Sequence, residues 1–420
     1  MDLSQLAAIP EVQITTGVAM SIHAFPSISR PSVTGKPLHL TLPVDPASCA
    51  LPIRQAWRDR ARVKATMKRW NDLSHLFRTE DAKRSTAPDW MPVTLLLAMG
   101  ARDALQEAGS LSKVPTVEII ERLMANYPSD YVPALLAALG HIDLGQSLRG
   151  TVPASSLSPD RDAAYRAHID RAAEIVDVIS RYAPNSAAVA TARCAVLPAS
   201  SDPTLGVRAE FKRLIDLDPT NPMHMRGLGT YLLPRWFGSH DRIEEEARKT
   251  MDRTRGIWGR GAYAWVWMDA LALDEEAAAT MNPELFLEGV HDILARAETP
   301  REANLWAAFA GITMRPEPCE RPGRASDNRA RLHKAFRWIM LDHVSALHPA
   351  YWSEALHRLS PCDTAMRRLR RSTLPSRDSM GRFVQSLPQY MPEGFGLQVL
   401  MCEASPVQVQ PRRLSRAAKH

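Results

Sequence analysis

The sequence has few features that would identify a chemistry. Its 5 cysteines are scattered, and none shows the close C-x-x-C spacing of zinc or redox sites, which favours isolated reduced thiols in a reducing cytosol. The longest apolar run, residues 91–100, is far short of the roughly 20 residues that a membrane-spanning helix needs. The start "MDLSQLAAIPEVQ" has no basic region and no small-residue cleavage site. We therefore expect neither a membrane span nor a cleaved secretory signal peptide.

No metal or cofactor site is predicted either. The segment "LDHVSALHPAYWSEALHRL" (341–359) holds three histidines, but Pro349 interrupts the helix between them, so no zinc-binding face forms. The glycines of "GIWGRGAYAW" (256–265) follow no strand and precede no Lys-Ser/Thr pair. This argues against a phosphate-binding loop and favours close helix packing.

The net charge of +6 is concentrated at the ends of the chain. Residues 1–70 carry +5 and residues 363–420 carry +6, which leaves −5 on residues 71–362. A nucleic-acid-binding protein is expected to carry its positive charge on the folded scaffold, so this distribution argues against a nucleic-acid partner. The strongest basic cluster is either a solvated face or a contact for an acidic partner. It consists of Arg367, Arg368, Arg370 and Arg371.

The chain divides into three segments. Residues 1–52 are rich in Pro and Ser and are predicted to be a largely disordered or loosely docked leader. Within them "HLTLPVD" (39–45) could form a short strand, but nothing nearby offers a partner strand. Residues 53–360 are predicted to be helical almost throughout, and residues 361–420 to be a basic, irregular C-terminal segment.

A repeat is visible within the helical segment. Three stretches share the order amphipathic helix, proline, small polar residue, second helix: "ERLMANYPSDYVPALLAALG", "VDVISRYAPNSAAVATARCA" and "FKRLIDLDPTNPMHMRGLGT". We place each proline near the first turn of its second helix, where its missing N–H has no helical partner. Pro184 and Pro219 are 35 residues apart, close to the tetratricopeptide length of about 34. "MNPELF" (281–286) and "LHPAYW" (347–352) are candidates for further copies. The fold class predicted is all-α, a tetratricopeptide-like helical-repeat array (α-solenoid) with irregular ends.

The segment "PRWFGS", which begins at Pro234, interrupts two predicted helices. In a structural interpretation, Pro234 ends the first helix and Trp236 fills the gap between adjacent helical pairs. Gly238 then supplies a backbone conformation closed to other residues. Ser239 or Asp241 caps the following helix, the latter through a capping box with the glutamate three residues on.

In a functional interpretation, the same segment is a polar cluster around a ligand. Arg235, Ser239, His240 and Asp241 would then converge on one point. The consecutive Ser-His-Asp is not a catalytic triad, because three successive residues entering a helix point in different directions.

The next helix is rich in aromatic residues. In "GIWGRGAYAWVWMDAL", Trp258 and Trp265 share a face and are predicted to be core. Tyr263 and Trp267 lie on another face, and we predict them as possible contacts for a partner.

These segments resemble an uncharacterised bacterial family of tetratricopeptide-like helical proteins that carry a "PRWGGS" motif. The order "LDPTNP", "LLPRWFGS", "GAYAWVWMDAL" is similar to the family's, as are "RWNDLSHLFRTED" and "DWMPVTLLLAMG" upstream. The resemblance covers about residues 65–315 and implies a helical-repeat fold but no chemistry. Phe237 stands where the family has its first glycine. Either the turn differs here, or that glycine serves close packing.

The function predicted is therefore a non-enzymatic protein–protein interaction or scaffold module with a protein or peptide partner and no cofactor. This rests on the repeat, the acidic body and the lack of a coherent catalytic set. One alternative is a small-molecule-binding or enzymatic domain centred on Arg235. A further alternative is a secreted bacterial effector with an uncleaved export signal in its leader. A cytoplasmic location is expected for the first two.

Overall fold

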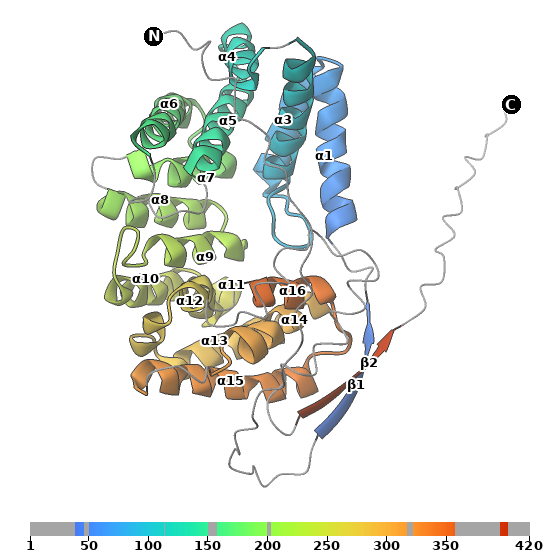
Figure 1. Cartoon of the computed structure of the whole chain (residues 1–420), viewed down its shortest axis with the longest axis vertical. Coiled ribbons are helices and arrows are strands. Elements are labelled where there is room, and N and C mark those ends of the chain that lie inside the picture. Colours follow the sequence, from blue (N-terminus) through green and yellow to red (C-terminus); the bar gives the residue numbers. More distant parts are fainter. Residues whose placement is uncertain are drawn as a thin grey trace, which may run out of the picture.

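The computed structural model describes residues 38–45, 50–112, 114–149, 158–199, 203–316, 322–357 and 395–401. Helices make up almost all of this part of the chain (Figure 1). The all-α fold class predicted from the sequence is thereby confirmed. The basic cluster at residues 367–371, residues 1–37 and most of the predicted C-terminal segment lie outside the described residues.

Three helices form the N-terminal part of the helical body: α1 (Leu51–Thr66), α2 (Trp70–Lys83) and α3 (Val93–Ser112). α1 buries Ala61 and Ala65, small residues four apart that let it lie close to its neighbours. Behind α2 the backbone turns sharply at Arg84, which takes a left-handed conformation with φ of 55°.

Three helix–turn–helix units follow, and they coincide with the three stretches identified in the sequence. They comprise α4 (Thr116–Asn126) with α5 (Tyr131–Arg149), α6 (Pro159–Tyr182) with α7 (Ala187–Ala195), and α8 (Pro203–Leu217) with α9 (Pro222–Tyr231). A short 3-10 helix, Leu197–Ala199, lies between the second and third units. Figure 1 shows the units stacked on one another.

The turns of the three units have the same construction. In each turn, the residue two positions after the proline donates its backbone N–H to the carbonyl oxygen of the residue before the proline. The donors are Asp130 (3.1 Å), Ser186 (3.1 Å) and Asn221 (3.5 Å). The side chains of these three residues then accept a backbone N–H of the helix that begins next. Pro128, Pro184 and Pro219 thus occupy the second position of a β-turn, where a fixed φ is favourable. We placed these prolines near the first turn of the second helix; each lies three residues before that helix begins, and its role is in the turn.

The C-terminal end of α2 crosses all three turns. The Asp81 carboxylate accepts from the Tyr131 hydroxyl (3.3 Å) in the first unit and from the Ala188 backbone N–H (3.1 Å) in the second. Arg84 donates to the carbonyl oxygens of Asn185 (2.6 Å) and Leu217 (3.1 Å), in the second and third. Burial, together with Asp81, raises the pKa of Tyr131 to about 12. α2 therefore fixes the units relative to one another.

The remaining helices enclose a second core centred on α12. They are α10 (His240–Arg253), α11 (Arg255–Trp258), α12 (Gly261–Leu273), a 3-10 helix (Glu276–Ala279), α13 (Pro283–Ala295), α14 (Pro300–Ala308) continued by a π-helical turn (Phe309–Thr313), α15 (Arg324–Asp342) and α16 (Pro349–His357). Trp265 of α12 is fully buried, and its ring lies 5.0 to 6.0 Å from the rings of Trp90, Trp258 and Trp306. At the two predicted further copies, Pro283 and Pro349 are each the first residue of a helix.

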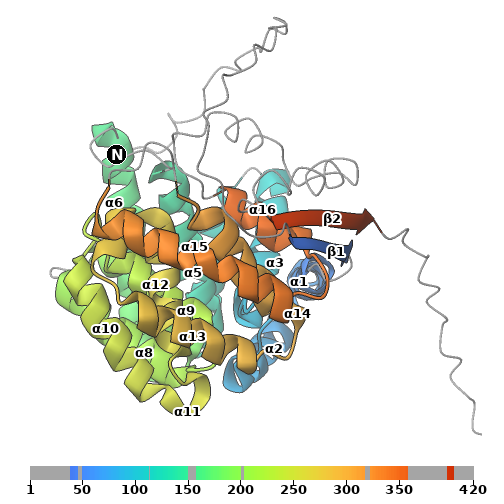
Figure 2. The same cartoon turned by 90° about the horizontal axis from the view of Figure 1, so that it is seen from below.

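Part of the predicted leader is an ordered strand. β1 (Leu38–Val44) pairs in parallel with β2 (Phe395–Met401), in a register that sets Leu38 opposite Phe395. Leu347, between α15 and α16, bonds to β1 on both sides: its N–H donates to Pro43 (2.8 Å), and its carbonyl accepts from Asp45 (2.9 Å). Figure 2 shows the strands beside α16. Residues 38–44 are therefore neither disordered nor loosely docked. The strand's partner was missed because it lies near the other end of the chain.

Candidate functional site

The "PRWFGS" segment forms the corner between α9 and α10. Backbone hydrogen bonds stabilise this corner. The N–H groups of Trp236 and Gly238 donate to the Leu233 carbonyl oxygen over 2.9 and 3.4 Å. The Phe237 N–H donates to the Tyr231 carbonyl oxygen over 3.2 Å. Leu233 is fully buried, so the corner is anchored in the core beneath it.

Gly238 is required for space and not for conformation. Its φ is not positive, and an added Cβ would lie 2.9 Å from the Cα of Leu232 and closer still to that residue's carbonyl oxygen. Our expectation of a special backbone conformation here was wrong. Phe237 has no positive φ either, so it is not strained in the glycine position of the motif. Its ring packs 5.9 Å from that of Tyr231.

Trp236 lies on the surface with 41% of its area exposed, so it does not fill the gap between helical pairs as expected. The guanidinium carbon of Arg149, at the end of α5, lies 4.7 Å above the Trp236 ring and 5.4 Å from that of Tyr165 in α6. Arg149 also donates to the Tyr165 hydroxyl over 3.3 Å. Arg235 is exposed and forms no ion pair or hydrogen bond with any described residue. Trp236 and Arg149 thus meet at the surface of this corner. The sequence did not predict this contact, because Arg149, Tyr165 and Trp236 come from three separate elements.

The three polar residues after the corner point to different partners. Ser239 is the N-cap of α10 and accepts the Arg242 backbone N–H over 3.3 Å. His240 contacts a carboxylate oxygen of Asp274 over 2.9 Å. Asp241 is exposed on the first turn of α10 and is not the capping residue. Ser239, His240 and Asp241 therefore do not converge on one point.

Tyr263 and Trp267 are fully buried, so the prediction that they contact a partner was wrong. The Tyr263 hydroxyl and the Trp267 indole N–H, the latter over 3.2 Å, both donate to one carboxylate oxygen of Glu244 in α10. Burial, reinforced by Glu244, raises the pKa of Tyr263. Glu244 is thereby used in holding α10 against α12, where we had expected a capping box.

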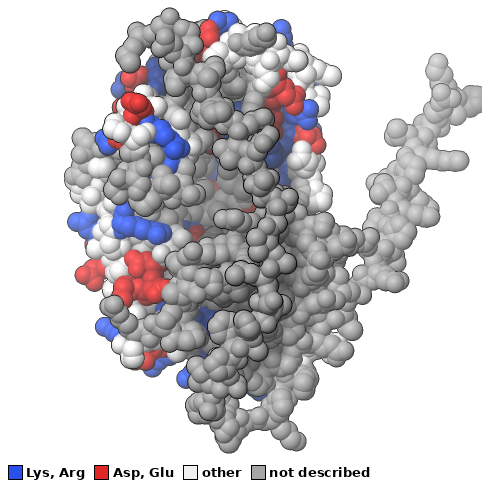
Figure 3. Space-filling view, viewed as in Figure 1, with Lys and Arg blue, Asp and Glu red and all other residues white. Residues whose placement is uncertain are grey.

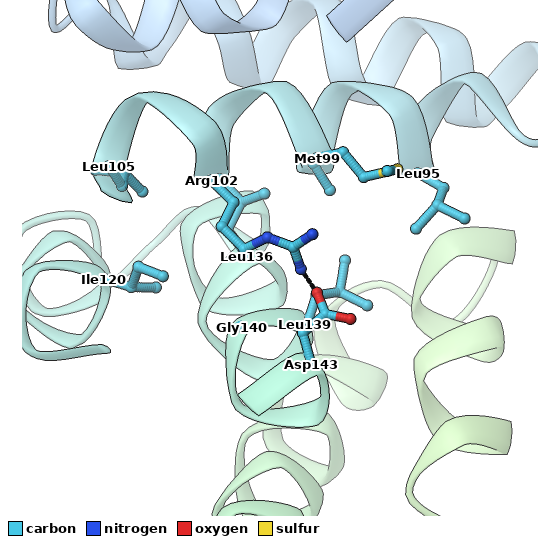
Figure 4. A pocket seen from close by; sticks show the side chains of 10 residues that line it. Leu95, Met99, Arg102, Leu105, Ile120, Leu136, Leu139, Gly140 and Asp143 are labelled. Atoms are coloured by element: carbon cyan, nitrogen blue, oxygen red, sulfur yellow. Dashed lines mark ion pairs between the residues drawn. The ribbon is translucent and has the colours of Figure 1, made fainter. Parts of the chain in front are cut away.

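A separate small pocket lies between α3, α4 and α5 (Figure 4). Aliphatic side chains line most of it, and the Arg102 side chain of α3 crosses it to pair with Asp143 of α5. Burial lowers the pKa of Arg102. Both charged groups of this lining, Arg102 and Asp143, are thus engaged with each other.

The described residues also bear on metal binding and on membrane insertion. No group of three or more His, Cys, Asp or Glu side chains among them could hold a metal ion. None of their helices is long and apolar enough to cross a membrane. Basic and acidic side chains are interspersed on the face shown in Figure 3.

The fold and the corner define an all-α protein with a surface-exposed cation–aromatic cluster. In comparisons with known proteins, no family model matches the chain, and no curated protein or solved structure is significantly similar to it. The resemblance to the "PRWGGS" family stays a prediction.

Proposed function

We propose that this chain is a non-enzymatic protein-interaction module of the tetratricopeptide-like helical-repeat kind. It binds a protein or peptide partner at the corner between α9 and α10. The stacking of three helical units with similarly built turns, tied together by α2, supports the repeat assignment.

The observation that carries the proposal is the exposed Trp236 with Arg149 above its ring. The preceding residue, Arg235, is exposed as well. Tryptophan and arginine are the residue types most enriched among the side chains that dominate binding energy. Here the backbone bonds of the corner fix the position of the Trp236 backbone, and its ring already contacts Arg149, so less entropy is lost when a partner binds.

The alternative of an enzymatic or small-molecule site centred on Arg235 has no supporting observation. It requires Ser239 or Asp241 to converge on the guanidinium. Ser239 instead caps α10 and Asp241 extends from the first turn of that helix, with no described residue bonded to its side chain.

Partner capture with the full-length chain tests the proposal. The bait variants are Trp236→Ala and Arg235→Ala, and Tyr182→Ala is the matched control because Tyr182 is an exposed aromatic residue of α6 with 79% of its area accessible. We expect crosslinking at native expression levels to recover a partner with wild type and the control, and markedly less with the two corner variants. Equal recovery with all baits would reject the corner as the binding surface, and no reproducible partner would reject the interaction function.

A further inference from the structure

The outer face of α1 carries an apolar stripe. Ile53, Ala56, Arg60 and Val63 of α1 and Met67, the C-cap of this helix, follow one another at alternating spacings of three and four residues, and all five are exposed. Three of them are large and apolar: Ile53 has 46% of its area accessible, Val63 has 52% and Met67 has 63%. Alternating steps of three and four place side chains along one seam of a helix, as at the a and d positions of a coiled coil.

The opposite face of α1 packs against α3. Arg58 pairs with Asp103 (2.7 Å) and Arg62 with Glu107 (3.0 Å), which ties α1 to α3. Figures 1 and 2 both place α1 at the edge of the molecule, on the other side from α10. An outermost helix of a stacked helical protein normally presents a polar face to water, so an apolar seam in this position indicates a surface that becomes covered.

Three cations lie in or close to the seam. Arg60 lies within the seam and Lys64 lies beside it on α1, while Lys68 follows the C-terminal end of the helix with a left-handed backbone (φ of 55°). No carboxylate among the described residues pairs with any of the three. Asp59 is the single acidic residue of α1, and its side chain accepts a hydrogen bond from Gln55 (2.9 Å). Whatever covers the seam is therefore expected to bring negative charge.

We propose that α1 docks an acidic amphipathic helix of another protein. The apolar residues of that helix pack against the seam, and its carboxylates pair with Arg60, Lys64 and Lys68. A second copy of α1 fits poorly, because in an antiparallel pair Arg60, at the centre of the seam, would face its own counterpart. A membrane surface fits less well too, since membrane-binding helices have a broad apolar face with large residues, whereas this stripe is a narrow seam that contains Ala56 and Arg60.

The test uses the full-length protein and a synthetic probe. The probe is a fluorescein-labelled peptide of about four heptads with Leu at the a and d positions and Glu at the flanking positions. A second peptide has Lys in place of every Glu. Fluorescence anisotropy is recorded for wild type, Val63→Lys and Val178→Lys. Val178 is the matched control, because it is a helical valine of α6 with the same 52% exposure as Val63.

We expect the acidic peptide to bind wild type and Val178→Lys alike, and Val63→Lys at least about tenfold more weakly. Lys64→Glu together with Lys68→Glu is expected to weaken binding similarly, and the Lys peptide is expected not to bind. Thermal melting checks that each variant is folded.

Three outcomes would overturn the proposal. The first is equal affinity of the acidic peptide for Val63→Lys and wild type, or no binding to either. The second is binding to phosphatidylserine vesicles that Val63→Lys abolishes, which would assign the face to a membrane. The third is self-association of the protein that Val63→Lys abolishes, which would assign it to a second copy. Trp236→Ala is expected to leave peptide binding unchanged, so this proposal and the one for the corner fail independently.

Discussion

Replacement of Gly238 by alanine is expected to lower the free energy of unfolding by about 1–3 kcal/mol, the usual cost of overpacking a closely packed site. The new methyl group would lie within 2.9 Å of the Leu232 Cα, and even closer to a carbonyl oxygen that cannot rotate away. Relief requires the backbone of the corner to move. The same movement would shift Trp236, only two residues away, from its position beneath Arg149.

Urea unfolding followed by circular dichroism measures this effect. With a slope of about 3 kcal/mol/M, the expected loss lowers the midpoint by about 0.3–1 M. Gly256→Ala is the matched control, since an added Cβ there meets no atom within 4 Å and α11 is helical. That variant is expected to be unchanged or stabilised by up to about 1 kcal/mol. If both alanine variants have the wild-type midpoint, the close approach at Gly238 does not limit the corner and our explanation of this glycine is wrong.

Three further predictions concern the scaffold. Asn304→Leu is expected to destabilise the protein by about 2–5 kcal/mol. The buried Asn304 amide oxygen accepts from the Trp352 indole N–H and the His348 backbone N–H, and both donors would lose their acceptor. A urea midpoint within error of wild type would contradict this. Arg84→Ala, which removes three hydrogen bonds to the backbone carbonyls of Asp81, Asn185 and Leu217, is expected to cost about 2–4 kcal/mol. Arg122→Ala, at an exposed ion pair, is expected to cost under about 1 kcal/mol. Burial and the neighbouring His141 lower the pKa of His168, so the unfolded state binds this proton more readily and stability is expected to fall as the pH drops below about 6.5. His168→Gln should flatten this part of the pH–stability curve, and an unchanged curve would show that His168 does not contribute to it.

Local signals made the helices and the three helical units predictable from the sequence. Apolar residues at helical spacing and turns built around proline act within a few residues, so they do not depend on the rest of the fold. The Arg149–Trp236 contact was not predictable in this way, because it depends on how α5 and α6 pack against the corner. The same holds for the partner of β1.

The prediction for Tyr263 and Trp267 failed for a physical reason. Periodicity assigns faces to a helix but does not say how many of those faces are covered. α12 packs against α9, α10 and α13, and so is buried on almost every side. One signal in the sequence could have shown this. "GAYAWVWMDALAL" contains a single charged residue, Asp269, and a helix that is apolar all round is usually buried. Asp269 is paired with Arg226 in two hydrogen bonds of 2.9 and 3.0 Å.

The pairing of β1 with β2 sets an order of events during synthesis. The helical units are built from neighbouring segments and can dock as they leave the ribosome. β1 is made before any of them, yet its partner at residues 395–401 emerges only after every described helix. Among the described residues, β1 therefore gains its strand partner last, and until then the edge that β2 will cover is exposed for other chains to bind.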